Sequence, residues 1–463
     1  MRRRLLARVM CPCCWAKFAP TEVLFIASHP EERGDELLGP DEAKRFLPTR
    51  FTPAGEAIDA RGAPTSRMAC PRCHLPFPHD VLERMPLILS LAGMPASGKT
   101  FFLAAAMWQL RQLLPRDFGI TFQDADALIN RPIAANEERL FLADDPGNAV
   151  ALEKTELEGG DAFAVQLTPG ITTFLPRPYL FSLRPRAEHA NGTARDRLTY
   201  LFCLYDNAGE HFLPGADTPT APGTRHLSEA RVVLCLFDPL QDVRFRERLR
   251  QSSRDPQLDM PIRGMRQDTM LVELANRIRT ATGLAPHARI KRPLFLLVSK
   301  SDAWGSLVPG LDLTTEPYQP LNPGRKVGHV DRDRISQVSV RIREMLREIA
   351  PEVVAAAEDA FERIFFIPVS STGTAPMLDK ATGLLKVLPS SIHPHWVTVP
   401  FVYALARYSK HLIAFTDSKA GQSADQRFDG AVGEEAGALS PAFDDDDGLT
   451  SERAGREELH HGS

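Results

Sequence analysis

Short runs of almost unbroken apolar residues recur through the middle of the chain, and each ends in small or charged residues. The runs cover residues 86–93, 197–206, 231–238, 293–302 and 364–371. Runs of this length predict strands that are buried on both faces, as in a parallel sheet between layers of helices.

Other segments carry the spacing of amphipathic helices. Residues 268–279 repeat apolar side chains every three or four positions, and residues 340–349 and 398–408 also have a helical character. We interpret these apolar stripes as core packing. The alternation of strands and helices predicts an α/β fold with a doubly wound, mostly parallel sheet.

Composition separates a C-terminal tail from the rest of the 463 residues. Apolar content of 43% and charged content of 25% are ordinary for a globular protein. After Thr416 the chain loses apolar residues and includes the run Asp444–Asp447, which predicts a disordered acidic tail. Together with the cysteine motifs described below, which define the first part, this predicts domains at 1–83, 84–416 and 417–463.

Charge is distributed unevenly. The total is −4, but residues 417–463 hold 12 acidic and 4 basic residues, a balance of −8 that leaves +4 for the rest. The small total favours neither a nucleic-acid binder nor a membrane-surface protein. No apolar run reaches the ~18 residues of a membrane helix, and the apolar stretch after the basic start is too short and broken for a secretory signal. We expect a cytoplasmic protein without a membrane span.

The run at 86–93 ends in the pattern Gly-x-x-x-x-Gly-Lys-Thr, and a helix-like segment follows at once. Its glycines let backbone N–H groups turn toward phosphate oxygens, its lysine adds a charge for the β- and γ-phosphates, and its threonine hydroxyl can bind Mg²⁺. This P-loop pattern, placed between a buried strand and a helix, predicts nucleoside triphosphate binding. The expected contact residues are Gly93, Ala96, Ser97, Gly98, Lys99 and Thr100.

Later runs end in residues that suit the rest of a nucleotide site. Asp206 ends a strand expected beside the P-loop strand and can hold Mg²⁺, and Gly209 can turn its N–H toward a γ-phosphate. Asp302, which follows another run, can accept paired hydrogen bonds from guanine, while Lys300 covers the base face. Because adenine lacks that donor pair, the pattern favours GTP over ATP.

Two copies of Cys-Pro-x-Cys-x-x-x-Phe stand at residues 11–18 and 70–77. Each Cys-x-x-Cys turn directs two thiolates to one side, and four thiolates complete a tetrahedral, structural Zn²⁺ site. The gap between the copies is wider than in common zinc ribbons, so we interpret the intervening segment as an insertion. Cys13 and His74 are alternative ligands, and a redox pair is the alternative chemistry. The expected ligands are Cys11, Cys14, Cys70 and Cys73.

These motifs, in this order, resemble those of P-loop GTPases of the translation-factor and Ras-like class. The matching segments, over about residues 86–412, are Gly93–Thr100, Asp206–Gly209, Ser299–Asp302 and Ser370–Ser371, the last suited to a backbone contact with the base. With its Cys-Pro-x-Cys ribbon before the P-loop, the chain is similar to bacterial double-GTPase proteins. The resemblance implies GTP/GDP and Mg²⁺ as ligands, and a protein partner that in that family is a second GTPase in defence-like systems.

The chain departs from the family pattern at three positions. Ser299 replaces the usual Asn or Thr, and Pro95 stands where glycine is common. Glu210 occupies the position of the glutamine that orients the attacking water in Ras-like proteins, and we expect it to share the catalytic role with Lys99. A carboxylate near developing negative charge predicts slow intrinsic hydrolysis that a partner stimulates.

The second motif of the family requires a threonine that reaches Mg²⁺ ahead of the strand that pairs with residues 197–206. Residues 179–183 are the expected partner strand, and Thr172 and Thr173 lie upstream of it. We take Thr173 as the candidate Mg²⁺ ligand. A pair of β-favouring threonines explains the same residues equally well.

We therefore expect a Mg²⁺-dependent GTP-binding switch that acts on a protein partner through the surface around residues 207–225. One alternative is an ATP-using P-loop protein. Another is a scaffold that binds nucleotide without turnover and works through its zinc ribbon. Nucleic-acid binding by the ribbon is less favoured, because no basic and aromatic stripe accompanies it.

Overall fold

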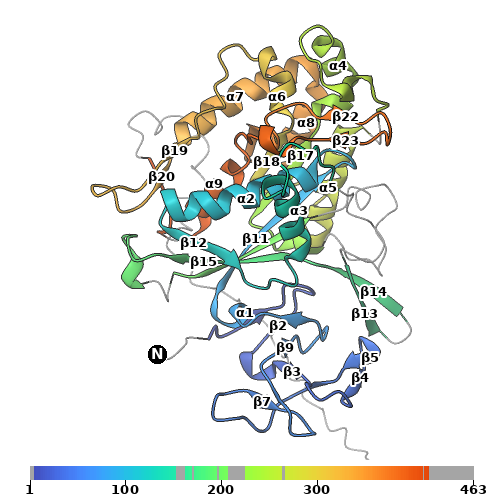
Figure 1. Ribbon diagram of the computed structural model, residues 1–463, viewed down its shortest axis with the longest axis vertical. Helices are drawn as coiled ribbons and strands as arrows, with labels where there is room; N and C mark the ends of the chain where they lie inside the picture. Colours follow the sequence, from blue (N-terminus) through green and yellow to red (C-terminus); the bar gives the residue numbers. More distant parts are fainter. Residues whose placement is uncertain are drawn as a thin grey trace, which may run out of the picture. The chain divides into compact units, whose positions relative to one another are not determined.

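A sheet of seven strands forms the centre of the computed structural model (Figure 1). The structure describes residues 5–152, 162–168, 171–194, 198–206, 225–262, 266–409 and 411–416. In spatial order the strands are β12 (Ile120–Asp124), β15 (Tyr179–Pro185), β16 (Tyr200–Asp206), β11 (Met85–Gly93), β17 (Val232–Phe237), β18 (Leu294–Val298) and β21 (Ile364–Pro368).

The sheet is mostly parallel. The strands from β16 to β21 run parallel to one another, whereas β15 is antiparallel to both β16 and β12. Every residue of β17 and β18 is buried, which explains why these strands are continuous apolar runs in the sequence. The predicted α/β class with a large, mostly parallel sheet is confirmed, and β15 pairs with β16 as expected.

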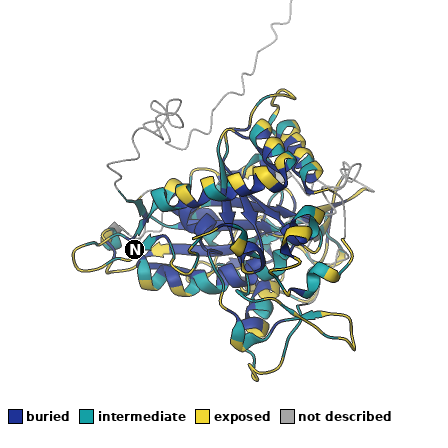
Figure 2. Ribbon diagram, turned by 90° about the horizontal axis from the view of Figure 1, so that it is seen from above, coloured by how far each residue is buried: buried dark blue, intermediate teal, exposed yellow. Residues whose placement is uncertain are grey.

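Helices flank the sheet, and Figure 2 shows the buried strands between helices with exposed outer faces. The segments expected to be helical fall in α5, α7 and α9, whereas α8 has no counterpart among the predictions. Among the described residues, no helix is both long and apolar enough to traverse a bilayer. The helices are α1 (Asp80–Glu83), α2 (Lys99–Asp117), α3 (Arg131–Phe141), α4 (Val243–Leu249), α5 (Gln267–Thr282), α6 (Ser301–Trp304), α7 (Arg332–Ile349), α8 (Pro351–Ala360) and α9 (Val399–Tyr408).

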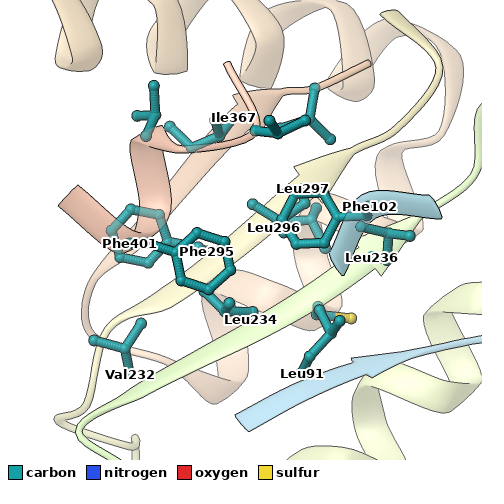
Figure 3. Packing of buried hydrophobic residues seen from close by; sticks show 14 of the residues in the cluster. Leu91, Phe102, Val232, Leu234, Leu236, Phe295, Leu296, Leu297, Ile367 and Phe401 are labelled. Atoms are coloured by element: carbon teal, nitrogen blue, oxygen red, sulfur yellow. The ribbon is translucent and has the colours of Figure 1, made fainter. Parts of the chain in front are cut away.

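The core lies between the sheet and these helices (Figure 3). Phe102 of α2 stacks on Phe401 of α9 with ring centroids 5.8 Å apart. Phe295 of β18 contributes a third buried ring to the same cluster. This packing fixes α2 against the sheet and thereby positions the turn that joins it to β11.

The N-terminal residues form small strands around the two cysteine motifs. β1 pairs with β2, and β10, β9, β3 and β6 form a four-stranded sheet, while β4–β5 and β7–β8 are hairpins within the predicted insertion. Contacts unite residues up to Thr416 into one compact unit, and residues 417–463 lie outside the described residues. The strands are β1 (Val9–Met10), β2 (Lys17–Phe18), β3 (Leu24–Ile26), β4 (Arg33–Asp35), β5 (Gly39–Ala43), β6 (Arg45–Phe46), β7 (Ala57–Ile58), β8 (Pro64–Thr65), β9 (Met68–Ala69) and β10 (Pro76–Phe77).

Among the described residues, three further groups of strands lie outside the large sheet. β13 and β14 form a hairpin ahead of β15, β22 and β23 form another, and β24 pairs with β20 of the β19–β20 hairpin. Their bounds are β13 (Ala162–Thr168), β14 (Ile171–Pro176), β19 (Tyr318–Gln319), β20 (His329–Val330), β22 (Met377–Leu378), β23 (Leu385–Lys386) and β24 (Ala414–Phe415).

Candidate nucleotide and metal sites

The turn from β11 to α2 is tight and requires glycine at two positions. A Cβ atom on Gly93 would lie 2.9 Å from Leu236 Cβ and 3.1 Å from Ser97 Oγ. Gly98 has a φ of +92° and Ala96 a φ of 63°, both in the left-handed region. The loop therefore curls back on itself between the end of the strand and the first turn of the helix.

The Lys99 side chain closes this loop from within. Its Nζ donates hydrogen bonds to the backbone oxygens of Gly93, at 2.8 Å, and Met94, at 3.2 Å. The ammonium group thus lies against the loop backbone rather than extending into solvent. A phosphate that enters the loop would find this charge in place.

Asp206 lies at the same end of the sheet as this loop. β16 pairs with β11 in parallel register, with Asp206 opposite Leu91, two residues before Gly93. Thr100 follows Lys99 in the first turn of α2. The sheet thus brings Asp206 and Thr100, two of the three expected Mg²⁺ ligands, to the same edge. Their chemistry, a carboxylate and a hydroxyl, suits a hard cation such as Mg²⁺.

The expected roles of three further residues stay predictions. Gly209 and Glu210 lie outside the described residues, so their expected roles stay predictions. Thr173 is in β14, where it pairs with Val165 of β13. Its hairpin contacts the turn between β4 and β5, since the backbone N–H of Gln166 donates to the Leu37 oxygen at 2.8 Å. The role of Thr173 as a Mg²⁺ ligand also stays a prediction.

The end of β18 is anchored by an ion pair that the local sequence pattern does not predict. Lys300, at a φ of 57°, contacts the carboxylate of the fully buried Asp238 at 2.5 Å and Gln257 Oε1 at 2.7 Å. Ser299 Oγ donates to the Phe237 backbone oxygen at 3.1 Å, which ties β18 to β17. One feature of the sequence could have pointed to this ion pair: Asp238 ends an apolar run, as Asp206 does.

Asp302 and Ser370 meet across the ends of β18 and β21. Ser370 Oγ donates to Asp302 Oδ1 at 2.5 Å and accepts the backbone N–H of Gly373 at 2.8 Å. The backbone of Ser370 also exchanges two hydrogen bonds with His395, at 2.8 and 3.0 Å. Burial lowers the pKa of His395, although the Asp302 carboxylate opposes that change. The exposed Asp302 carboxylate is thus held by one oxygen, and Ser371 follows in the same turn.

The four cysteines expected as ligands lie together near the N-terminus. Their Sγ atoms all lie within 4.8 Å of one another, with Cys11 and Cys73 3.8 Å apart and Cys14 and Cys70 3.7 Å apart. A tetrahedral zinc with Zn–S bonds of about 2.3 Å separates its sulfurs by about 3.8 Å. The spacing of the donor atoms therefore fits zinc.

The two cysteine turns share one backbone conformation. The residue after each pair has a φ in the left-handed region, 58° for Trp15 and 60° for His74. Its N–H donates to the backbone oxygen of the first cysteine at 3.0 Å. In each turn the N–H two residues after the first cysteine donates to that sulfur at 3.3 Å. Such N–H···S hydrogen bonds stabilise thiolates.

The remaining candidate ligands have other surroundings. The Cys13 sulfur is not part of the four-sulfur group, although its N–H donates to Cys11 Sγ. His74 Nδ1 lies 2.8 Å from Asp35 Oδ2. Burial raises the pKa of the Cys11 thiol, but hydrogen bonds from Cys13, Cys14 and Cys73 outweigh burial and lower it to about 5. Cysteine binds a metal in the thiolate form.

Comparison with known proteins gives one distant relative. No protein-family model matches the chain. A protein of Mycolicibacterium smegmatis, named "Putative ESX-1 scaffolding and assembly protein SaeC", is 26% identical over 201 residues. The match covers 42% of this chain and 44% of the relative, so the chain spans less than half the length of the curated protein it matches.

Among solved structures, the crystal structure of sup35 complexed with GDP is similar at 11% sequence identity. That match covers 62% of this chain and 38% of the other, with a TM-score of 0.20. An overlap of this size bears on neither the fold nor the ligand of the present chain.

Proposed function

We propose that this chain is a P-loop GTPase that binds GTP with Mg²⁺, hydrolyses it slowly and signals its nucleotide state to a protein partner. The observation that carries the proposal is the Lys99 ammonium group folded into the Gly93–Thr100 loop, at the turn from a buried central strand to a helix. Such a turn binds phosphate through its N–H groups, its helix dipole and the lysine charge.

The phosphate end of the site uses residues from two adjacent strands. Lys99 would exchange its backbone acceptors for phosphate oxygens, while the backbone N–H groups of residues 94–99 surround the phosphates. Thr100 and Asp206 would hold Mg²⁺, which would neutralise charge on the phosphates. β11 lies between β16 and β17, where strand order reverses, and ligands of open α/β sheets bind at such points.

The base end rests on Asp302. The Ser370 hydroxyl holds one carboxylate oxygen, and a carboxylate fixed in this way suits the paired N–H donors of guanine. Lys300 is held at the same strand end by Asp238 and Gln257, so its aliphatic stem is restrained beside Asp302. Ser370 and Ser371 belong to the turn that would contact the base through its backbone.

A protein partner and a structural zinc complete the proposal. The name of the M. smegmatis relative describes scaffolding and assembly, which supports a role in protein interactions. The four cysteine sulfurs have the spacing of a closed zinc site, which leaves no position for catalysis. A second GTPase as partner, and stimulated hydrolysis through Glu210, belong to the proposal on the family resemblance alone.

Competitive nucleotide binding in Mg²⁺ tests this function. We expect the wild type to prefer GTP over ATP by well over tenfold, and Lys99→Ala to lose at least about tenfold in affinity because a charge-assisted hydrogen bond is removed. Asp302→Asn should lower GTP affinity and raise the affinity for xanthine nucleotides, whose base offers an acceptor to the new amide. Asp359→Asn, an exposed change on α8, is the matched control.

The same experiment separates the alternatives. ATP binding equal to or tighter than GTP binding, unchanged in Asp302→Asn, would identify an ATP-using protein. Tight GTP binding without phosphate release, even with a cognate partner, would identify a non-hydrolysing scaffold.

A further inference from the structure

A buried tyrosine joins the cysteine ribbon to the large sheet. Tyr205, the residue before Asp206 in β16, is fully buried. Trp15 Nε1 donates to its hydroxyl oxygen at 3.2 Å, and the hydroxyl donates in turn to the Pro12 backbone oxygen. Both partners come from the first cysteine turn, so a single hydroxyl is held from two sides by the ribbon.

The positions of these partners depend on the sulfur cluster. Pro12 lies between Cys11 and Cys14, and Trp15 follows Cys14 directly in a left-handed conformation. A metal that binds both sulfurs fixes the loop that carries the Pro12 oxygen and the Trp15 indole. The geometry of the metal shell is therefore transmitted to Tyr205 through two hydrogen bonds.

A histidine covers another side of the tyrosine ring. His226, fully buried and located just before β17, stacks on Tyr205 with ring centroids 4.5 Å apart at an angle of 23°. Its ring also lies 6.0 Å from that of Trp15. Tyr205 therefore sits between the ribbon and the segment that leads into β17, and its ring has little freedom to move.

The geometry points to Tyr205 as a positioning residue for Asp206, through which a metal-loaded ribbon raises the affinity for Mg²⁺ and nucleotide. Adjacent side chains of a strand point to opposite faces, so fixing Tyr205 on the ribbon side orients the backbone of Asp206 on the nucleotide side. This inference rests on the proposed GTPase function. Because coupling between two binding sites is reciprocal, nucleotide with Mg²⁺ must also tighten zinc binding.

The test uses the full, zinc-loaded chain and the dissociation of fluorescent GDP over a range of Mg²⁺ concentrations without chelator. Tyr205→Phe keeps the ring and removes the hydroxyl. We expect it to raise the Mg²⁺ concentration needed to retain GDP by at least about fivefold, the factor that corresponds to the loss of one hydrogen bond, since both hydrogen bonds of the hydroxyl are removed. Binding without Mg²⁺ should not change. Tyr318→Phe, which removes the hydroxyl that contacts Thr398, is the matched control. It should leave unchanged both the Mg²⁺ concentration needed to retain GDP and the binding of GDP without Mg²⁺.

Two results would overturn the inference while leaving the proposed function intact. One is a Tyr205→Phe protein that retains GDP with the same Mg²⁺ dependence as Tyr318→Phe. The other is read on the wild type, and so does not depend on how well a variant folds: zinc release to a chromogenic chelator that GDP with Mg²⁺ fails to slow. A wild type that binds no guanine nucleotide at any Mg²⁺ concentration would instead overturn the proposed function, and the inference with it.

Discussion

Glu316 is a buried carboxyl group with one oxygen left without a hydrogen-bond partner among the described residues. Its Oε1 accepts the Trp396 backbone N–H at 3.3 Å, while Oε2 is buried and unpaired. Burial raises the pKa of Glu316 to about 7, although the Trp396 hydrogen bond and the Arg334 charge oppose this. The group therefore changes charge near neutral pH.

The raised pKa makes stability depend on pH. The folded chain binds a proton at Glu316 more tightly than the unfolded chain, so this stabilisation is complete below about pH 4.5 and is lost as pH rises through about 7. The wild type should therefore lose this contribution as pH rises, whereas Glu316→Gln should not. We expect the difference in free energy of unfolding, variant minus wild type, to rise by about 1–3 kcal/mol from pH 5 to pH 8. Urea unfolding at several pH values measures this. The exposed Glu362→Gln is the control, and a constant offset across pH would contradict the prediction.

At the scale of elements, the first cysteine turn contains two adjacent thiols with different expected roles. Cys14 belongs to the four-sulfur group, whereas the neighbouring buried Cys13 does not. We expect Cys14→Ala to lose bound zinc, because three thiolates leave the tetrahedral shell open. Cys13→Ala should keep about one zinc per chain, since it removes no sulfur from the shell. Zinc content after dialysis, measured by atomic emission, distinguishes the two, and equal zinc loss in both would contradict this assignment.

The strands of the sheet differ in how far they could be predicted. β17 and β18 could be predicted because burial on both faces leaves an unbroken apolar run. The edge strand β12 could not, since exposed residues at its end interrupt any pattern. One residue separates the end of α7 from α8, which begins with Pro351. From the sequence alone, this short segment is not predicted as a separate helix but as part of the connection to β21.

The residues of the candidate site also differ in how far they could be predicted from the sequence. Lys99, Asp302 and the cysteines could be singled out because local spacing alone brings their functional atoms to a strand end or a turn. Tyr205 could not, because its partners lie far along the chain and its own run shows only apolar burial. The pairing of Lys300 with Asp238 was missed for a similar reason: neighbouring strands, not neighbouring residues, create it.

At the scale of the whole molecule, the described chain closes on itself near Thr416. β24 adds to β20 in parallel register, and Phe415 packs on Tyr403 of α9 with ring centroids 5.1 Å apart. The segment before it contributes the buried Leu412 and Ile413 to the main core. The last described strand is therefore part of the compact unit.

Two truncated chains measure what this strand contributes. One chain ends after Thr416 and keeps the last strand. The other ends after Ser409 and loses two buried aliphatic side chains, together with the strand that packs on α9. We expect the free energy of unfolding of the shorter chain to be lower by about 3–6 kcal/mol, from about 1.5–3 kcal/mol per buried side chain. Urea unfolding of both proteins tests this, and coincident transitions would refute it.

The contact between Trp15 and Tyr205 joins residues 190 positions apart, and this separation has a consequence for biosynthesis. At about 5–20 residues per second, Trp15 leaves the ribosome on the order of 10–40 s before its partner. All four thiolates are available once Cys73 has been made, well within that interval. The nascent ribbon can therefore bind its metal and fold before β16 is synthesised. β16 then packs against a ribbon surface that has already formed.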